Sequence, residues 1–244
     1  MYTSPMFHKI LGYKPWCWEA DPNVIKKGDV YHLYSNDLIG IKESISHDGI
    51  HFRFHRRIAV RALRSYVTWP YLYYEKHTNL RKFPFYQSHL RRHHLITGED
   101  TLVLDEFYSH ASPSLIGDIL FFSTGYQQMD YWFAEPTTMK RIDKKPLTGL
   151  EHITSLRQFG SRYFGTHISV RDGKSTAKIV ECFPKNKFCT WTIGKDILTP
   201  REVSPRATHV YVPSFVDGKL YFNVRFGRSI FASEWIMMTE LPYS

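Results

Sequence analysis

Cysteine is scarce in this sequence: among 244 residues it occurs only at Cys17, Cys182 and Cys189. An odd and scattered set of cysteines does not describe a disulfide framework. The separation of Cys182 from Cys189 is also unlike the usual spacing of zinc ligands. We therefore expect reduced structural thiols, and no metal site is predicted.

Long apolar runs are missing as well. No stretch approaches the length of a membrane-spanning helix, and the N-terminus lacks the basic start and apolar segment of a secretion signal. Sustained helical periodicity is also absent, which argues against a helical fold. These absences predict a cytoplasmic protein with no membrane partner.

The residues that are abundant favour strands. Apolar residues make up 43% of the chain and aromatic residues 16%, mostly Tyr and Phe. Aromatic side chains suit pleated, half-buried surfaces. A chain of this length and composition fits one large all-β domain.

Internal repetition organises these strands. A proline, an apolar pair, a glycine turn and an aromatic alternating run recur along the chain. The repeats are ADPNVIKKGDVYHLYS (20–35), TWPYLYYEKHTNLRKFPFYQS (68–88), ASPSLIGDILFFSTG (111–125), the proline-free ITSLRQFGSRYFGTHISV (153–170) and VPSFVDGKLYFNVRFG (212–227). Each is followed by a second strand pair, for example around Asp48-Gly49, and such joints are hairpin signals.

Five units of four short antiparallel strands predict a five-bladed β-propeller. The expected blades cover residues 17–60, 61–105, 106–148, 149–200 and 201–244 of a single domain, 1–244. A β-sandwich of similar size is the alternative, but it would not require a repeat of this period.

The repeat alignment predicts a pocket on the propeller axis. The first strand of each blade lines the axis, and Pro22, Pro70, Pro113 and Pro213 suit the first position of such a strand. The residues beside them should converge. On this alignment Asp21 faces Trp69, Ser112, Val212 and the neighbourhood of Thr154.

The first repeat resembles the first blade of the five-bladed propeller glycosidases, which include the family 43 arabinanases and xylosidases and the family 32 fructosidases. The resemblance rests on Asp21-Pro22 and on a serine, serine, Asp-Gly and aromatic element. The residues of that element are Ser44, Ser46, Asp48, Gly49 and Phe52.

The resemblance implies a glycosidase with Asp21 as its general base or nucleophile. The family also carries an Asp in the second blade, where the alignment gives Trp69, and a Glu general acid in the third, where it gives Ala111. Hydrolysis of a glycosidic bond usually needs two carboxyl groups. A non-standard acid is therefore required, with Glu19, Glu106, Asp105, Glu151, His110 and His209 as candidates.

Other side chains near the strand starts are expected to bind the substrate. Trp69 offers a stacking surface for a sugar and Arg157 a partner for a carboxylate or phosphate. The full expected set is Trp69, Ser112, Arg157, His209 and Tyr211. The sequence indicates no cofactor, and no ligand set indicates an axial cation.

Charge bears on the partner. The formal net charge is +9, concentrated in RFHRRIAVRALR (53–64) and HLRRHH (89–94). These runs are either solvated outer strands or a surface that attracts anions, such as an acidic glycan, a phosphorylated sugar or nucleic acid. No nucleic-acid-binding motif accompanies them. The alternative to hydrolysis is therefore a propeller that binds an anionic sugar or another small molecule, or a repurposed enzyme of a small-molecule pathway.

Overall fold

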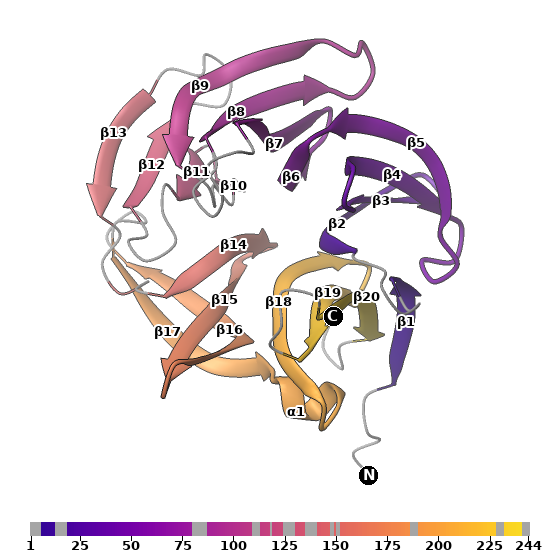
Figure 1. Ribbon diagram of the computed structural model, residues 1–244, viewed down its shortest axis with the longest axis vertical. Coiled ribbons are helices and arrows are strands. Elements are labelled where there is room, and N and C mark those ends of the chain that lie inside the picture. The colour runs from indigo at the N-terminus through magenta and orange to yellow at the C-terminus, as the bar shows by residue number, and fades with distance from the viewer. Residues whose placement is uncertain are drawn as a thin grey trace.

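The computed structural model of the chain is built almost wholly from β-strands (Figure 1). It describes residues 6–12, 19–79, 87–108, 113–117, 119–123, 130–134, 141–146, 149, 152–185, 190–227 and 232–240. Within these ranges the single helix is α1 (Pro200–Val203), a single turn. No helix in the described ranges is long and apolar enough to cross a membrane. The prediction of an all-β chain is confirmed.

Three sheets have four antiparallel strands each, in sequence order from one edge to the other. The first sheet contains β2 (Ala20–Lys27), β3 (Val30–Asn36), β4 (Gly40–Ser46) and β5 (Arg53–Val60). The second contains β6 (Ala62–Thr68), β7 (Tyr71–Asn79), β8 (Gln87–His94) and β9 (Asp100–Tyr108). The third contains β10 (Ser114–Ile116), β11 (Ile119–Ser123), β12 (Asp130–Ala134) and β13 (Arg141–Pro146).

The remaining strands form an eight-stranded sheet with two halves. One half contains β14 (Ile153–Phe159), β15 (Arg162–Arg171), β16 (Lys174–Lys185) and β17 (Thr190–Leu198). The other contains β18 (Ala207–Val216), β19 (Lys219–Phe226), β20 (Ser233–Glu240) and β1 (Phe7–Leu11). The halves meet through one parallel pair, Ala177 with His209.

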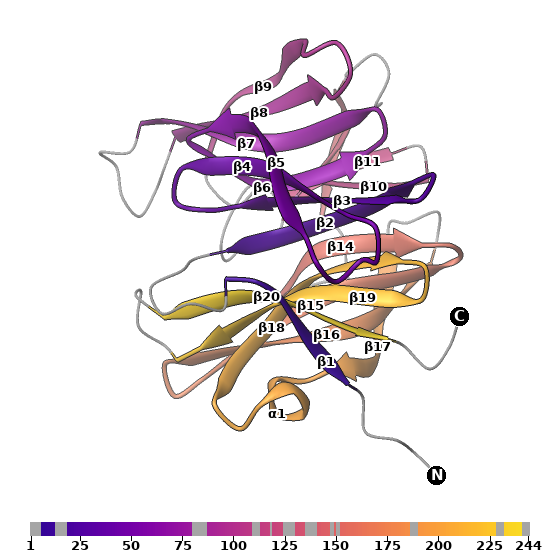
Figure 2. The same cartoon turned by 90° about the vertical axis from the view of Figure 1, so that its right-hand side faces the viewer.

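The sheets lie around a common centre, with β2, β6, β10, β14 and β18 nearest to it (Figure 1). Seen from the side, the sheets are arranged one beside the next, with the first sheet next to the half that contains β18 (Figure 2). β1 pairs with β20, so a strand from the start of the chain completes the last group of strands. The sequence analysis did not assign a strand there.

Hairpin turns explain the order of the strands. The β18–β19 connection is Asp217-Gly218, with φ of 49° and 71°. Two successive positive φ values are those of a type I′ turn, which matches the twist of antiparallel strands. The expected Asp-Gly hairpin is thus confirmed at this position.

The core is divided among the interfaces between sheets. One apolar cluster joins the first two sheets through Tyr34 and Ile41 on one side and Leu72 and Tyr74 on the other. A second joins the first sheet to β19 and β20, and a third joins the third sheet to β14–β17. Each sheet packs its faces against the neighbouring sheets, and the apolar core lies in these contacts. Polar side chains can therefore occupy the strand ends near the centre.

Candidate functional site

The inner strands share one irregularity. Asp21 in β2, Arg64 in β6, Ser155 in β14 and Val212 in β18 have φ of 55°, 49°, 50° and 52°. In each case the pairing with the next strand shifts register at this residue. A non-glycine residue in the left-handed region costs roughly 1–2 kcal/mol. Its recurrence at a register shift in four inner strands identifies these residues as equivalent positions around the ring.

This equivalence corrects the sequence alignment in the second repeat. Arg64, not Trp69, occupies the place that corresponds to Asp21. Trp69 and Pro70 form the turn after β6, at the other end of that strand. Trp69 is 39% exposed, and Nζ of Lys27 lies over its ring, 3.0 Å from the centroid. The predicted place of Trp69 opposite Asp21 is wrong.

The residue two positions after each bulge joins its sheet to the next. Asn23 donates from Nδ2 to the Ser65 carbonyl oxygen at 2.7 Å, and the Tyr66 hydroxyl donates to the Leu115 carbonyl oxygen at 3.3 Å. Ser214 accepts from the Val24 amide at 2.8 Å.

Arg157 makes the corresponding contact between β14 and the third sheet. Its Nη1 donates to the Pro113 carbonyl oxygen at 2.9 Å and to Ser114 Oγ at 2.6 Å. The guanidinium also lies 4.6 Å from the centroid of the Tyr66 ring. These bonds fix the inner strands relative to one another, and with them the residues at the bulges.

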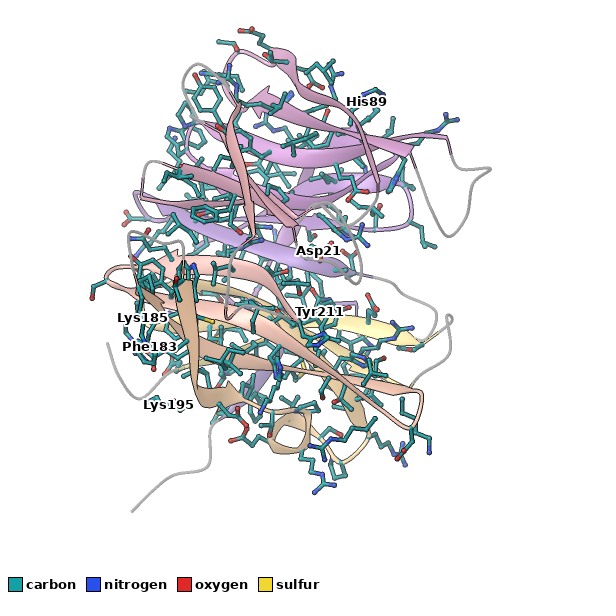
Figure 3. The ribbon with its side chains drawn as sticks, turned by 90° about the vertical axis from the view of Figure 1, so that its left-hand side faces the viewer. Asp21, His89, Phe183, Lys185, Lys195 and Tyr211 are labelled. Atoms are coloured by element: carbon teal, nitrogen blue, oxygen red, sulfur yellow. The ribbon has the colours of Figure 1, made fainter. Side chains whose placement is uncertain are left out.

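Asp21 lies near Tyr211 (Figure 3). Its amide donates to Asn223 Oδ1 at 2.6 Å, while Asn223 Nδ2 donates to the Glu19 carbonyl oxygen at 2.9 Å. The Asp21 residue keeps part of its surface accessible although protein groups surround it. Burial raises the pKa of the Asp21 carboxyl, and the nearby guanidinium groups of Arg64 and Arg157 oppose this rise.

Arg64 pairs with a second acid. Its Nη1 lies 3.0 Å from Oε2 of Glu75, a β7 side chain with no exposed surface. Burial lowers the pKa of the Arg64 guanidinium. Together the Glu75 and Asp21 carboxylates raise this pKa by more than burial lowers it, so the net shift is upward. Arg64 therefore remains a cation between two carboxylates.

Tyr211 brings a third acid to the cluster. Burial raises the pKa of its hydroxyl well above the usual value, and the Glu234 and Asp21 carboxylates add to this rise. Glu234 is 5% exposed, and its Oε1 lies 3.6 Å from Nη1 of Arg225. We call Asp21, Arg64, Glu75, Arg157, Tyr211, Arg225 and Glu234 the axial cluster.

Two of the expected site residues join Asp21 in this cluster, namely Arg157 and Tyr211. Glu19 does not face it, because its carboxylate bonds Lys42 Nζ and the Ser35 hydroxyl within the first sheet. Burial raises the pKa of the Glu19 carboxyl, and Lys42 opposes the rise.

His209 is also held elsewhere. Its Nδ1 lies 2.8 Å from Thr208 Oγ1 and its Nε2 lies 3.2 Å from Ser175 Oγ, where the two halves of the eight-stranded sheet meet. The imidazole therefore serves the contact between β16 and β18.

Several expected residues fall outside the part of the chain that the structure describes. His110, Ala111, Ser112 and Glu151 belong to undescribed segments. The side chains of Asp105 and Glu106 are likewise outside the description. Their proposed roles remain predictions.

Sequence reasoning missed Arg64, Glu75, Asn223, Arg225 and Glu234. Arg64 lies in ALRSYV (62–67), which begins a strand without the proline that marks other repeats. The other four lie on second or third strands of their sheets, and their proximity to Asp21 follows only from the ring. Among the described residues, no group of three or more His, Cys, Asp or Glu side chains is arranged to hold a metal ion.

Comparison with known proteins finds similarity in three dimensions. A thermostable family-43 glycoside hydrolase superposes with a TM-score of 0.66 at 11% identity, covering 93% of this chain and 91% of that one. A family-43 β-xylosidase/α-arabinofuranosidase from a compost microbial metagenome, in complex with xylotriose, gives 0.66 at 11%, with 98% and 96% covered. A family-62 α-L-arabinofuranosidase catalytic domain from Coprinopsis cinerea gives 0.57 at 9%, with 97% of both chains covered.

These neighbours are glycoside hydrolases with β-propeller folds, so the chain has a fold of that kind. No family model matches the sequence, and no curated protein matches it either. At such low identity the likeness establishes the fold, while the chemistry must be argued from the axial cluster.

Proposed function

We propose that this chain is a five-bladed propeller that binds a carbohydrate on its axis and hydrolyses a glycosidic bond, with Asp21 as the general base. The blades are the three four-stranded sheets and the two halves of the eight-stranded sheet. The single parallel pair between the halves supports counting them separately.

The position of Asp21 carries the proposal. Asp21 stands at the left-handed bulge of an inner strand. Backbone strain of this kind clusters at functional sites. Burial raises its pKa, which brings a carboxylate closer to the pKa that suits a general base near neutral pH. In the proposed reaction Asp21 accepts a proton from the water that attacks the anomeric carbon.

The charges of the axial cluster favour a neutral sugar. Three carboxylates, from Asp21, Glu75 and Glu234, stand beside the guanidinium groups of Arg64, Arg157 and Arg225. The formal charges of these described groups cancel. An uncompensated anion entering the site would have to displace an existing ion pair, so we propose a neutral glycan rather than the anionic sugar first considered.

The leaving oxygen needs a proton donor. Glu75 is a poor candidate, because its carboxylate is ion-paired with Arg64. We propose His110 or Glu106, which precede the inner strand of the third sheet in the sequence. Loss of turnover in His110→Ala or in Glu106→Gln, but not in both, would identify the acid.

The test compares the protein with Asp21→Asn on a panel of aryl glycosides and neutral oligosaccharides. Loss of a general base typically lowers the rate about 10²–10⁴-fold. Asp196→Asn, a change in an exposed β17 carboxylate paired with Lys178, is the matched control and should leave the rate unchanged. Hydrolysis that is indifferent to Asp21→Asn would remove Asp21 from the mechanism.

Arg64 favours a second candidate, a propeller that binds sugar without hydrolysing it. In the family that the first repeat resembles, the second blade carries an acid, whereas here the equivalent residue is a cation. The two candidates differ in a simple experiment. Calorimetric binding of an oligosaccharide that remains intact after prolonged incubation, in both the unaltered protein and Asp21→Asn, would support binding alone.

A further inference from the structure

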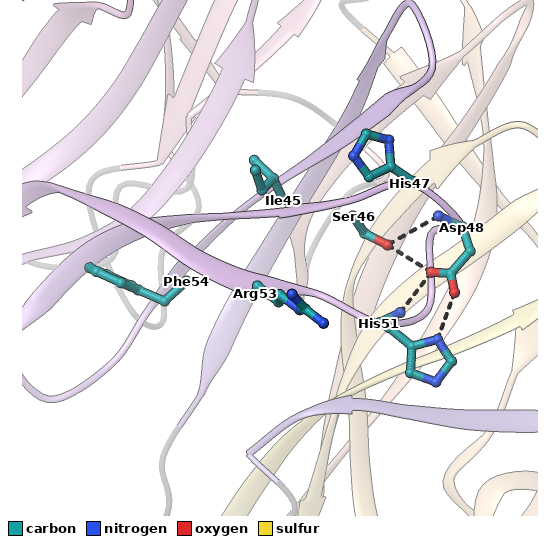
Figure 4. A pocket seen from close by; sticks show the side chains of 7 residues that line it. All are labelled: Ile45, Ser46, His47, Asp48, His51, Arg53 and Phe54. Carbon is teal, nitrogen blue, oxygen red and sulfur yellow. Dashed lines mark hydrogen bonds and ion pairs between the residues drawn. The ribbon is translucent and has the colours of Figure 1, made fainter.

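A cavity lies at the β4–β5 hairpin, at the end of the first sheet opposite Asp21. Its volume is about 590 Å³, and it is lined by Ile45, Ser46, His47, Asp48, His51, Arg53 and Phe54 (Figure 4). The register places it far from the axial cluster. Ala20, beside Asp21, pairs with Asn36 at one end of the sheet, whereas Tyr31 pairs with Ser46 at the other.

The single carboxylate in the cavity is already bound. Asp48 Oδ1 accepts from the Ser46 hydroxyl at 2.7 Å and from the amides of Ile50 and His51, each at 2.8 Å. Its Oδ2 lies 2.6 Å from His51 Nδ1, and these hydrogen bonds lower the pKa of Asp48 (Figure 4). The carboxylate therefore holds the turn and is not available to pair with the remaining cation in the cavity.

Most arginines of the basic run that leads into this cavity are neutralised. Arg56 bonds Glu43 at 2.5 Å, Arg57 bonds Asp37 at 2.8 Å, and Arg64 bonds Glu75 at 3.0 Å. In the second basic run, Arg91 bonds Asp100 at 2.8 Å. The positive charge of these segments is thus largely compensated by carboxylates of their own sheets.

Arg53 differs from these arginines. It is exposed in the cavity, and no acidic side chain among the described residues forms an ion pair with it. The exposed imidazoles of His47 and His51 line the same cavity, as does Phe54, a residue that is 62% exposed. A free guanidinium pairs with a carboxylate or sulfate in a planar, bidentate manner, and an exposed aromatic ring offers a face for a sugar.

We propose that the β4–β5 cavity is a second binding site, which takes an acidic glycan through Arg53, His47, His51 and Phe54. The recognised chemistry is an anionic carboxylate or sulfate group next to the apolar face of a sugar. The site is separate from Asp21 and does not require hydrolysis. It gives the excess positive charge of the chain a specific ligand while the axial cluster remains balanced.

Isothermal titration calorimetry tests this site. The probes are a galacturonic acid oligosaccharide, a sulfated oligosaccharide, a neutral xylo-oligosaccharide and a single-stranded oligonucleotide. Binding of an acidic probe should weaken at least about fivefold in Arg53→Ala, since a charge-assisted contact is lost. Arg201→Ala removes an exposed arginine from α1 and should change nothing.

Each outcome of the titration either supports or overturns the proposed site in the β4–β5 cavity. Preference for the carboxylated or the sulfated probe identifies the anionic group, and an affinity that falls steeply with salt supports the role of charge. Equal binding of the neutral probe, or unchanged binding by Arg53→Ala, would overturn the site. Tighter binding of a single-stranded oligonucleotide would overturn its assignment to a glycan. The same titration with Asp21→Asn should give the unaltered affinity, so failure here is distinct from failure of the axial site.

Discussion

The pair formed by Arg64 and Glu75 allows a quantitative test of the axial cluster. Glu75 has no exposed surface and Arg64 is 23% exposed at its side chain, so removing the cation deprives a buried carboxylate of its 3.0 Å guanidinium partner and leaves the 3.9 Å contact with His77. Such a change typically costs about 3–5 kcal/mol of the free energy of unfolding. For a chain of this size, that loss lowers the melting temperature by about 6–20 °C.

Arg64→Met is the suitable variant, because methionine also carries a Cβ and keeps the backbone cost of the left-handed position. The double variant Arg64→Met/Glu75→Leu replaces both charges by apolar groups and should lose less stability than Arg64→Met alone. The assay is chemical denaturation of both variants, of Glu75→Leu and of the unaltered protein, analysed as a double-mutant cycle.

Lys178→Met provides the matched control. Lys178 and Asp196 pair at 2.6 Å with side chains 35% and 45% exposed, and exposed pairs of this kind contribute about 0–1 kcal/mol. The reasoning is refuted if Arg64→Met unfolds at the unaltered midpoint, or if the costs of the two single changes simply add in the double variant.

Three further changes test individual contacts of the cluster and the core. The pKa of Asp21 is higher in the folded than in the unfolded chain, so ionised Asp21 lowers the stability of the fold at pH 7. Asp21→Asn should therefore raise the melting temperature at pH 7. The difference between the two proteins should shrink as the pH falls toward the ordinary Asp pKa of about 3.9. Burial raises the pKa of the Cys182 thiol to about 12, so in a chain carrying Cys17→Ser and Cys189→Ser a thiol reagent should react only after denaturant is added. Asn223→Ala removes the acceptor of the Asp21 amide and the donor to the Glu19 carbonyl oxygen. Chemical denaturation should show a loss of about 2–4 kcal/mol of the free energy of unfolding. A loss near zero would contradict the role of Asn223 as a bridge.

The fold could be predicted from local patterns because the hairpin turns and alternating strands repeat. Pro22 and Pro213 each directly follow a left-handed residue of an inner strand, so their spacing gave the correct equivalence of Asp21 and Val212. Pro70 gave the wrong one, since proline suits a hairpin turn as well as the start of a strand. The second sheet begins its inner strand without proline, and only the register of β6 and β7 identifies Arg64.

The axial cluster was harder to predict than the strands. Glu75 and Glu234 lie outside the inner strands that the repeats mark, and their distance from Asp21 depends on the curvature of several sheets. The basic runs were misleading for a related reason. Their arginines find carboxylates across strand pairs, such as Arg56 with Glu43, and these pairings depend on register rather than on local composition.

The pairing of β1 with β20 bears on how the protein is made. Phe7 lies opposite Thr239, so the edge of β1 stays uncovered after its synthesis until nearly all the rest of this chain has been made. Contacts so distant in sequence form slowly, and an unpaired strand edge is prone to associate with other chains in the meantime. Nascent protein should therefore depend on chaperones until synthesis has passed β20, and a circular permutation that joins β1 directly after β20 should relieve that dependence.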